Sequence, residues 1–178
     1  MKPLTKRLAI GAAVAVGALG LLTAAAYGLG LRINTSKSIP KGLYVMTKEP
    51  ITVGSYVILC PPDVGVFREA KERGYLGPGY CPGGYGNLMK RVLAAKEDVV
   101  TVSPQGVTVN GRLLPFSKPL PKDGAGRPMP AYQATTYTLG NLELLLMSDV
   151  SGTSFDGRYF GPVNVAQVQS VIHPVFTW

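Results

Sequence analysis

The sequence has few of the residues on which metal sites and most proteolytic sites depend. It holds one histidine, His173, and two cysteines, Cys60 and Cys81, among 178 residues. It contains no HExxH motif and no paired CxxC pattern, so we expect neither a metal ion nor another cofactor. His173 stands beside Pro174, where a lone histidine is more often structural. A Ser-His-Asp triad is therefore not expected, and a nucleophile would need another base.

Acidic side chains are also scarce. The chain has 10 acidic against 18 basic residues and a net charge of +8. Such an excess can serve contacts with nucleic acid or with an anionic membrane surface, or it can serve solubility alone. The basic residues are scattered as singles and pairs, not gathered into the stripe of a nucleic-acid reader. We therefore expect no nucleic-acid partner.

Charge is missing altogether from Leu8 to Leu31. A helix of this length, at about 1.5 Å per residue, crosses a hydrocarbon core of about 30 Å. Lys2, Lys6 and Arg7 precede the run, which favours an N-terminus in the cytoplasm and export of the remainder. We expect a cytoplasmic N-terminus (1–7), a membrane anchor (8–31) and an exported domain (32–178).

A cleaved signal peptide is the alternative for this segment. Ala24, Ala25 and Ala26 provide small residues for a cleavage site, and cleavage there would release a soluble periplasmic hydrolase beginning near Tyr27. An uncharged run of this length exceeds the usual apolar region of a signal peptide, which favours an uncleaved anchor.

Cys60 and Cys81 both lie on the exported side, where an oxidising compartment favours a disulfide. Two unpaired buried thiols are the alternative, and the spacing alone does not decide between them. The segment between the cysteines contains a short predicted helix, 66–73, flanked by Pro and Gly. A disulfide would pin this excursion and stabilise the fold by about 3 kcal/mol.

The exported part is predicted to be mainly β, with a partly closed sheet system. Runs rich in β-branched and aromatic residues, bounded by Pro and Gly, indicate strands, and Asn110-Gly111 is a strong hairpin signal. Residues 115–131 are dense in Pro, Gly and Lys and should form a long surface loop. The expected strands lie at 43–46, at 55–60, between 87 and 116, at 142–147 and at 168–176.

Lys90 is a candidate base. Strand alternation places it on one face with Leu88 and Val92, and burial among apolar side chains lowers the pKa of an ammonium group. A fall from about 10.4 to roughly 7 to 8 costs about 4 kcal/mol, which burial can supply. From the spacing alone, a lysine on an exposed strand edge is the more common case.

Three segments favour Lys90 as the base through their resemblance to a known family. SKSIPKGLY (36–44), LMKRV (88–92) and SFDGRYFGPV (154–163) resemble the serine, lysine and last boxes of type I signal peptidases, in the family's order. VGSYVILC (53–60) resembles the segment after the serine box. The KSIPKGLY form, CPGG at 81–84 and the short chain are similar to the TraF-type conjugative-transfer signal peptidases of bacterial plasmids. The resemblance implies a signal-peptidase-like β-fold catalytic domain with one N-terminal transmembrane helix. It also implies that the helix lies in the bacterial inner membrane and that the catalytic domain (32–178) lies in the periplasm.

The resemblance also implies roles for individual residues. Ser38 would be the nucleophile and Lys90 its general base. Ser36 matches the serine whose hydroxyl forms the oxyanion hole together with the Ser38 backbone N–H. Ser154 matches the serine that orients the lysine. Because Pro40 follows Ser38 one residue earlier than in the general family, Ser36 competes for the role of nucleophile.

Asp156 and Arg158 match the acidic and basic residues of the last box, and in the transfer branch the aspartate is regarded as needed for activity. We expect the two to pair, so that the carboxylate does not raise the pKa of Lys90. Two departures concern neighbouring positions. Gly157 replaces the usual serine, and Ser148-Asp149-Val150 replaces the usual Gly-Asp-Asn.

The resemblance implies a membrane-anchored serine endopeptidase that processes a pilin precursor through an acyl-enzyme. Either water or the pilin's own N-terminal amine would then attack the acyl-enzyme. Attack by the amine would give a cyclic pilin. Its expected partners are the pilin precursor, the inner membrane and other conjugative-transfer or pilus-assembly proteins. Ser38 follows the membrane segment closely, where a membrane-bound substrate would present its cleavage bond. The alternative function is a non-enzymatic periplasmic pilus-assembly factor that retains the peptidase fold.

Overall fold

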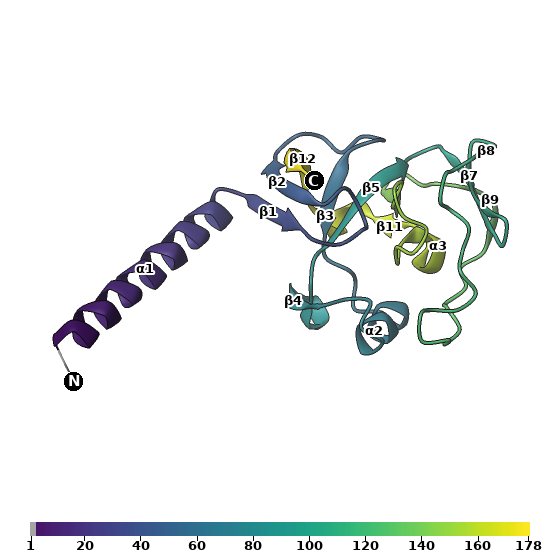
Figure 1. Cartoon of the computed structure of the whole chain (residues 1–178). Coiled ribbons are helices and arrows are strands. Elements are labelled where there is room, and N and C mark those ends of the chain that lie inside the picture. The colour runs from purple at the N-terminus through teal and green to yellow at the C-terminus, as the bar shows by residue number, and fades with distance from the viewer. Residues whose placement is uncertain (1–2) are drawn as a thin grey trace.

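A long N-terminal helix extends away from a β-rich body in the computed structural model, which describes residues 3–178 (Figure 1). Helix α1 covers Pro3–Gly28, and none of the segment Thr5–Gly28, of mean hydropathy 2.2, is buried. Its length and composition suit a membrane span. The helix ends before the uncharged run does, because Gly30 adopts a positive φ of 84° and strand β1 (Leu31–Asn34) begins. Lys2 lies outside the described residues.

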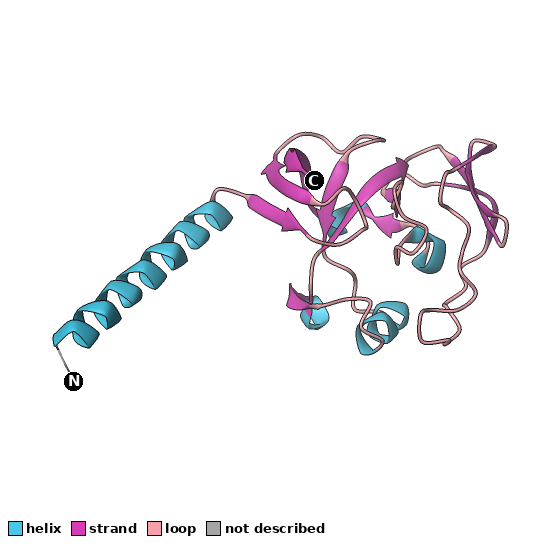
Figure 2. Ribbon diagram, in the orientation of Figure 1, coloured by secondary structure: helices cyan, strands magenta, loops and turns pink. Residues whose placement is uncertain are grey.

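The main sheet has seven antiparallel strands in the order β1-β2-β12-β3-β5-β10-β11. The expected strands after the membrane segment all belong to it or to a second sheet, so the prediction of a mainly β body is confirmed (Figure 2). Besides β1, the strands of the main sheet are β2 (Gly42–Thr47), β3 (Tyr56–Leu59), β5 (Leu88–Ala94), β10 (Glu143–Met147), β11 (Val163–Asn164) and β12 (Val168–Thr177).

A second, four-stranded sheet has the order β8-β7-β6-β9. A turn at 103–106 joins β6 to β7, and the turn predicted at Asn110-Gly111 joins β7 to β8. Strand β9 was not predicted, since its ATTYT sequence is mostly exposed and lacks an alternating apolar pattern. The strands are β6 (Val99–Ser103), β7 (Gly106–Val109), β8 (Arg112–Leu113) and β9 (Ala134–Thr138).

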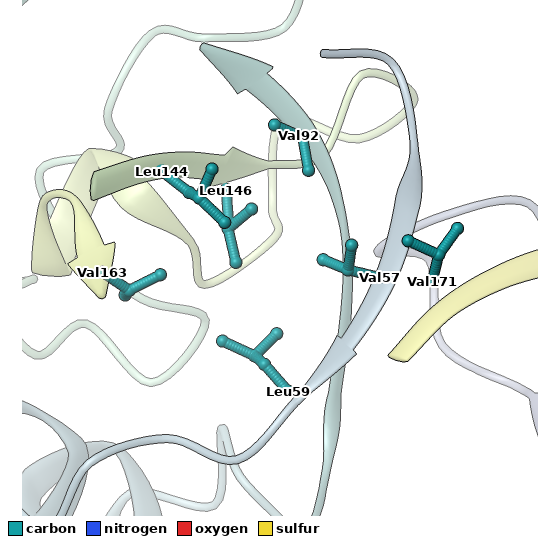
Figure 3. Packing of buried hydrophobic residues seen from close by; sticks show 7 residues of the cluster. All are labelled: Val57, Leu59, Val92, Leu144, Leu146, Val163 and Val171. Carbon is teal, nitrogen blue, oxygen red and sulfur yellow. The ribbon is translucent and has the colours of Figure 1, made fainter. Parts of the chain in front are cut away.

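Strand β10 joins the two sheets because it is buried on both faces. Leu144 and Leu146 point into the cluster drawn in Figure 3, with Val57, Leu59 and Val92 among its members. Leu145 and Met147, on the other face of the strand, pack into the cluster formed with the second sheet. A run of four consecutive apolar residues, LLLM, is what such a doubly covered strand requires.

The excursion between β3 and β5 packs through a third cluster against the region that follows β10. Helix α2 (Gly65–Glu72) confirms the expected helix and buries Phe67 and Ala70. Phe155 and Tyr159 meet it from the other side. The remaining elements are β4 (Pro78–Cys81), η1 (Pro82–Gly84), η2 (Val165–Gln167) and a helix that the sequence pattern did not predict, α3 (Gly157–Phe160).

Cys60 and Cys81 form a disulfide with a Cα–Cα distance of 5.3 Å, as expected for exported cysteines. The bond ties the end of β3 to the far end of the excursion. Residues 115–131 contain no helix or strand in the structure, apart from an isolated bridge between Lys122 and Pro128. The predicted long surface loop is therefore confirmed.

Replacing Cys60 and Cys81 together with serine should lower the free energy of unfolding by about 3 kcal/mol, because the open excursion gains entropy in the unfolded chain. Urea unfolding of the full chain in detergent measures this. A reducing agent should shift the wild-type midpoint in the same direction and leave that of the double variant unchanged. Equal midpoints for wild type and variant without reductant would contradict the prediction.

Candidate active site

The loop between β1 and β2 carries Ser36 and Ser38 and is held by the side chain of Asn34, which is 4% exposed. Asn34 Oδ1 accepts hydrogen bonds from the Ser36 backbone N–H (3.1 Å) and hydroxyl (2.8 Å). Its Nδ2 donates to the carbonyl oxygens of Ser36, Ile39 and Pro40. One amide group thus satisfies most of the polar atoms of the loop.

Sequence reasoning missed Asn34. The signal was present, since an Asn followed two residues later by Ser is typical of a side chain that closes an Asx turn. Two further contacts fix the loop after the serines. Ile39 is 1% exposed within an apolar cluster, and the Tyr44 hydroxyl donates to the Pro40 carbonyl at 2.6 Å.

Lys90 lies in the middle of β5 and is 1% exposed. Alternation along the strand buries it with Val92, whereas Arg91 is half-buried on the opposite face, so the predicted face is confirmed. Its Nζ lies 2.7 Å from Ser38 Oγ and donates to Ser154 Oγ at 3.0 Å. The structure therefore brings together three residues that lie far apart in the sequence.

Burial lowers the pKa of Lys90 from its ordinary value to about 8. The negative charge of Asp156 acts in the opposite direction and raises this pKa, while the positive charge of Arg158 lowers it. The expectation that pairing would keep the Asp156 charge from raising the pKa of Lys90 is therefore only partly met. Loss of hydration outweighs both charges, and an appreciable fraction of Lys90 is neutral near pH 8.

Asp156 and Arg158 form an ion pair with no solvent exposure on either side chain. Arg158 Nε and Nη2 donate to the two carboxylate oxygens, each at 2.8 Å. Asp156 Oδ2 also accepts from the Ser148 backbone N–H at 3.0 Å. The expected pairing is thus confirmed, in the two-pronged geometry that suits a guanidinium and a carboxylate.

The remaining donors of Arg158 bind backbone carbonyl oxygens. They reach Ser151 (3.1 Å), Gly152 (2.9 Å) and Ser154 (3.2 Å) in the segment before α3, and Phe116 in the long loop. The contact with Ser154 links the ion pair to the hydroxyl that touches Lys90. Arg158 therefore positions this part of the site through the backbone and does not itself contact Lys90.

Ser36 lies close to Ser38 but has different partners. Its hydroxyl donates to Asn34 and accepts from the Ser38 backbone N–H at 3.3 Å. Its partners are thus the loop's own atoms, whereas Ser38 contacts the buried amine. Of the two serines, the geometry favours Ser38 as the one that Lys90 can deprotonate.

His173 lies outside this group. It is half-exposed on β12 and contacts Glu49 at 2.8 Å. Within residues 3–178, no group of three or more His, Cys, Asp and Glu side chains could hold a metal ion. What the site does bring together is a hydroxyl and a partly neutral amine.

Comparison with known proteins agrees with this geometry. The family model described as signal peptidase, peptidase S26, matches residues 4–177. This chain belongs to the peptidase S26 family. The match indicates a signal-peptidase-like protein of the serine-protease kind.

Relatives within the S26 family are plasmid transfer proteins. The chain is 59% identical to a plasmid transfer protein TraF of Escherichia coli over the full length of both chains. It is 39% identical to a probable conjugal transfer protein TraF of Sinorhizobium fredii, over 97% of this chain and 91% of that protein. The expected TraF-type assignment is therefore confirmed.

The crystal structure of a signal peptidase I from Enterococcus faecalis aligns with 70% of this S26 chain and 98% of its own, at 15% identity and a TM-score of 0.40. A similarity of this size supports no detail of the site.

Replacing Asp156 with Asn in this S26 protein should lower the free energy of unfolding by about 3 to 5 kcal/mol, because the buried Arg158 keeps its charge and loses its counter-charge. Urea unfolding measures the loss. Asp63→Asn is the matched control, since it breaks an exposed pair with Arg68 and should cost much less. Equal losses for the two variants would show that the buried pair contributes no more to stability than an exposed one.

Proposed function

We propose that the protein is a membrane-anchored serine endopeptidase in which Ser38 is the nucleophile and Lys90 the general base. The observation that carries the proposal is the 2.7 Å contact between Ser38 Oγ and the amine of a fully buried lysine. The substrate is the pilin precursor of a conjugative transfer system, a proposal that draws on the plasmid-transfer relatives.

In the first step the neutral amine of Lys90 takes the Ser38 proton as Oγ attacks the carbonyl carbon. The same proton then passes to the leaving nitrogen as the peptide bond breaks, which gives an acyl-enzyme. Ser154 supports this cycle by binding Nζ and fixing its direction. Asp156 and Arg158 act as positioning residues, since they hold the backbone around Ser154.

The oxyanion would be bound by the Ser38 backbone N–H and the Ser36 hydroxyl. Both donors are engaged in the substrate-free loop, where the amide binds Ser36 Oγ and the hydroxyl binds Asn34. Rotation of the Ser36 hydroxyl about its side-chain bond frees both donors at once. One such donor is typically worth about 3 kcal/mol in the transition state.

The anchor favours a site close to the membrane. Only residues 29–30 separate α1 from β1, and the serine loop follows β1 directly. With Lys6 and Arg7 at the start of the helix, the positive-inside tendency favours a periplasmic domain. A precursor held by its own membrane helix would present its cleavage bond at this depth.

An acyl-enzyme can be resolved by water or by an amine, so the chemistry permits both a linear and a cyclic pilin. The runner-up function is a pilus-assembly factor that keeps the fold without catalysis. The lowered pKa of Lys90 and its contacts with two hydroxyls favour the enzyme, since such a costly burial has no value for an assembly factor.

Co-expression of a candidate pilin precursor with wild-type protein should shorten it, whereas Ser38→Ala and Lys90→Met should leave it intact. Mass spectrometry of the pilin measures this, and further loss of the mass of one water would report ring closure. Ser36→Ala should raise the activation free energy by about 3 kcal/mol, which slows the reaction roughly a hundredfold without abolishing it. If the precursor is shortened in the presence of Ser38→Ala but not of Ser36→Ala, the roles of the two serines are reversed. If conjugative transfer continues in cells that carry Ser38→Ala, the result supports the assembly-factor function.

The rate of cleavage, measured as kcat/KM, should rise about tenfold per pH unit at low pH and level off near pH 8, because only neutral Lys90 can accept the proton and its pKa is lowered to about 8. A pH series with a peptide substrate measures the profile. A rise that continues to about pH 10, the ordinary lysine value, would mean that the base is a solvated lysine.

A further inference from the structure

Two cavities meet at Ser38. The smaller, of about 270 Å³, is lined by Leu88, Met89 and Lys90 of β5, and we name it the strand-side cavity. The larger, of about 520 Å³, is lined by residues of the long loop, among them Gly124 and Met129, and we name it the loop-side cavity. The residues common to both linings are Ser36, Ser38, Tyr75 and Phe155.

The loop-side cavity has walls from three separate segments. Tyr75 comes from the excursion, Met129 from the long loop, and Ser151, Thr153 and Ser154 from the segment before α3. Aromatic rings and a thioether supply the apolar part of the lining, and hydroxyl groups supply a polar part, among them that of Ser154, which contacts Lys90. Such a lining suits an apolar side chain next to a polar backbone group.

The outer wall is held by contacts between the excursion and the long loop. The Tyr75 hydroxyl donates to Asp123 Oδ2 at 2.6 Å. Arg73 Nη1 donates to the Pro128 carbonyl at 2.5 Å, and Arg127 Nη2 donates to the Arg73 carbonyl at 3.2 Å. The disulfide also holds the excursion in place. Specific contacts therefore fix the outer wall of the cavity.

The strand-side cavity suits an extended peptide. Leu88, Met89 and Lys90 pair with β3 on one edge of β5, whereas β10 begins to pair with β5 only at Arg91. The other edge of these three residues has no strand partner within the described part of the chain, so a peptide can add there as a strand. The loop-side cavity offers no such edge.

The position of Ser154 gives the direction of the chain. This hydroxyl touches the amine of Lys90 and lines the loop-side cavity. Lys90 itself lines the strand-side cavity, and its Nζ reaches Ser154 at the loop-side cavity, so it can return the serine's proton to a leaving nitrogen held there. A peptide cleaved at Ser38 would run from the strand-side cavity, with its acyl half, into the loop-side cavity.

We propose that the loop-side cavity binds the residues that follow the scissile bond and then the amine that resolves the acyl-enzyme. This inference rests on the proposed function of Ser38 and Lys90. Aminolysis reverses the departure of the leaving amine, so one cavity serves both steps. The incoming nitrogen bonds to the acyl carbon as the carbon–Oγ bond breaks, and the proton that it loses passes through Lys90 to Ser38 Oγ. An amine held there competes with water.

The test uses the full chain in detergent and three probes. They are a peptide that spans the precursor's cleavage site, the methyl ester of its acyl half, and its leaving half as a free peptide. Wild type should cleave the peptide, and with ester and leaving half together it should form the joined peptide beside the free acid. Mass spectrometry measures the ratio of joined peptide to acid.

Gly124→Trp should lower this ratio by about tenfold, the order of one lost apolar contact in a pocket. A Cβ at Gly124 meets no atom within 4 Å, so the larger side chain enters open space. Met129→Trp fills the cavity from a second position. Ala125→Trp is the matched control, because Ala125 is exposed on the same loop and does not line the cavity, and it should leave the ratio unchanged.

Three outcomes would overturn a proposal. An unchanged ratio in both Gly124→Trp and Met129→Trp would show that the cavity holds no amine. An equal fall in ester consumption and in joined peptide would show that the acyl half occupies it. If wild type consumes neither the peptide nor the ester, the proposed function itself fails, which separates that failure from a wrong assignment of the cavity.

Discussion

The burial of a single amine is the constraint on which the site depends. Lys90 lies on strand β5 of the main sheet, is almost fully buried and has hydroxyl groups as its hydrogen-bonding partners. Burial of the ammonium form is costly and outweighs the attraction of the Asp156 charge, so the group gives up its proton more readily. The same burial that weakens the fold therefore makes the amine a base. Neighbouring hydroxyls satisfy Nζ in either protonation state, because a hydroxyl can both donate and accept.

Two buried charged side chains, Asp156 and Arg158, shift the pKa of this amine in opposite directions. Asp156 lies near enough to stabilise the ammonium form, and Arg158 offsets part of this effect while using the carboxylate as a support. The guanidinium donates its other hydrogen bonds to carbonyl groups of the segment that carries Ser154 and to the Phe116 carbonyl in the long loop. Three segments of chain thus share one buried ion pair, and the geometry of the hydroxyl beside Lys90 follows from it.

The sequence was sufficient to predict most of the elements and the charged residues of the site. Alternation in LMKRV placed Lys90 on the buried face, and resemblance in the other two boxes singled out Ser38, Ser154 and Asp156. Contacts between distant segments could not be predicted, because no local pattern encodes them. The binding of Tyr75 to Asp123 joins two irregular segments, and α3 is a single turn fixed by tertiary contacts. Asn34 is an intermediate case. The Asx turn that it closes could be predicted from the sequence, but its hydrogen bond to the Pro40 carbonyl could not.

The pairing of β2 with β12 has a consequence for the order of assembly. Residues 42–47 of β2, which follow the serine loop, have residues 171–177 of β12 as their partner on one edge. The approach is close enough that a Cβ at Gly42 would lie 2.2 Å from the Phe176 carbonyl oxygen. A growing chain makes the serine loop early and its supporting strand late, and such long-range pairing is slow. The nascent chain thus carries a serine loop without its supporting strand, and the proposed site is complete only after nearly the whole domain has been synthesised.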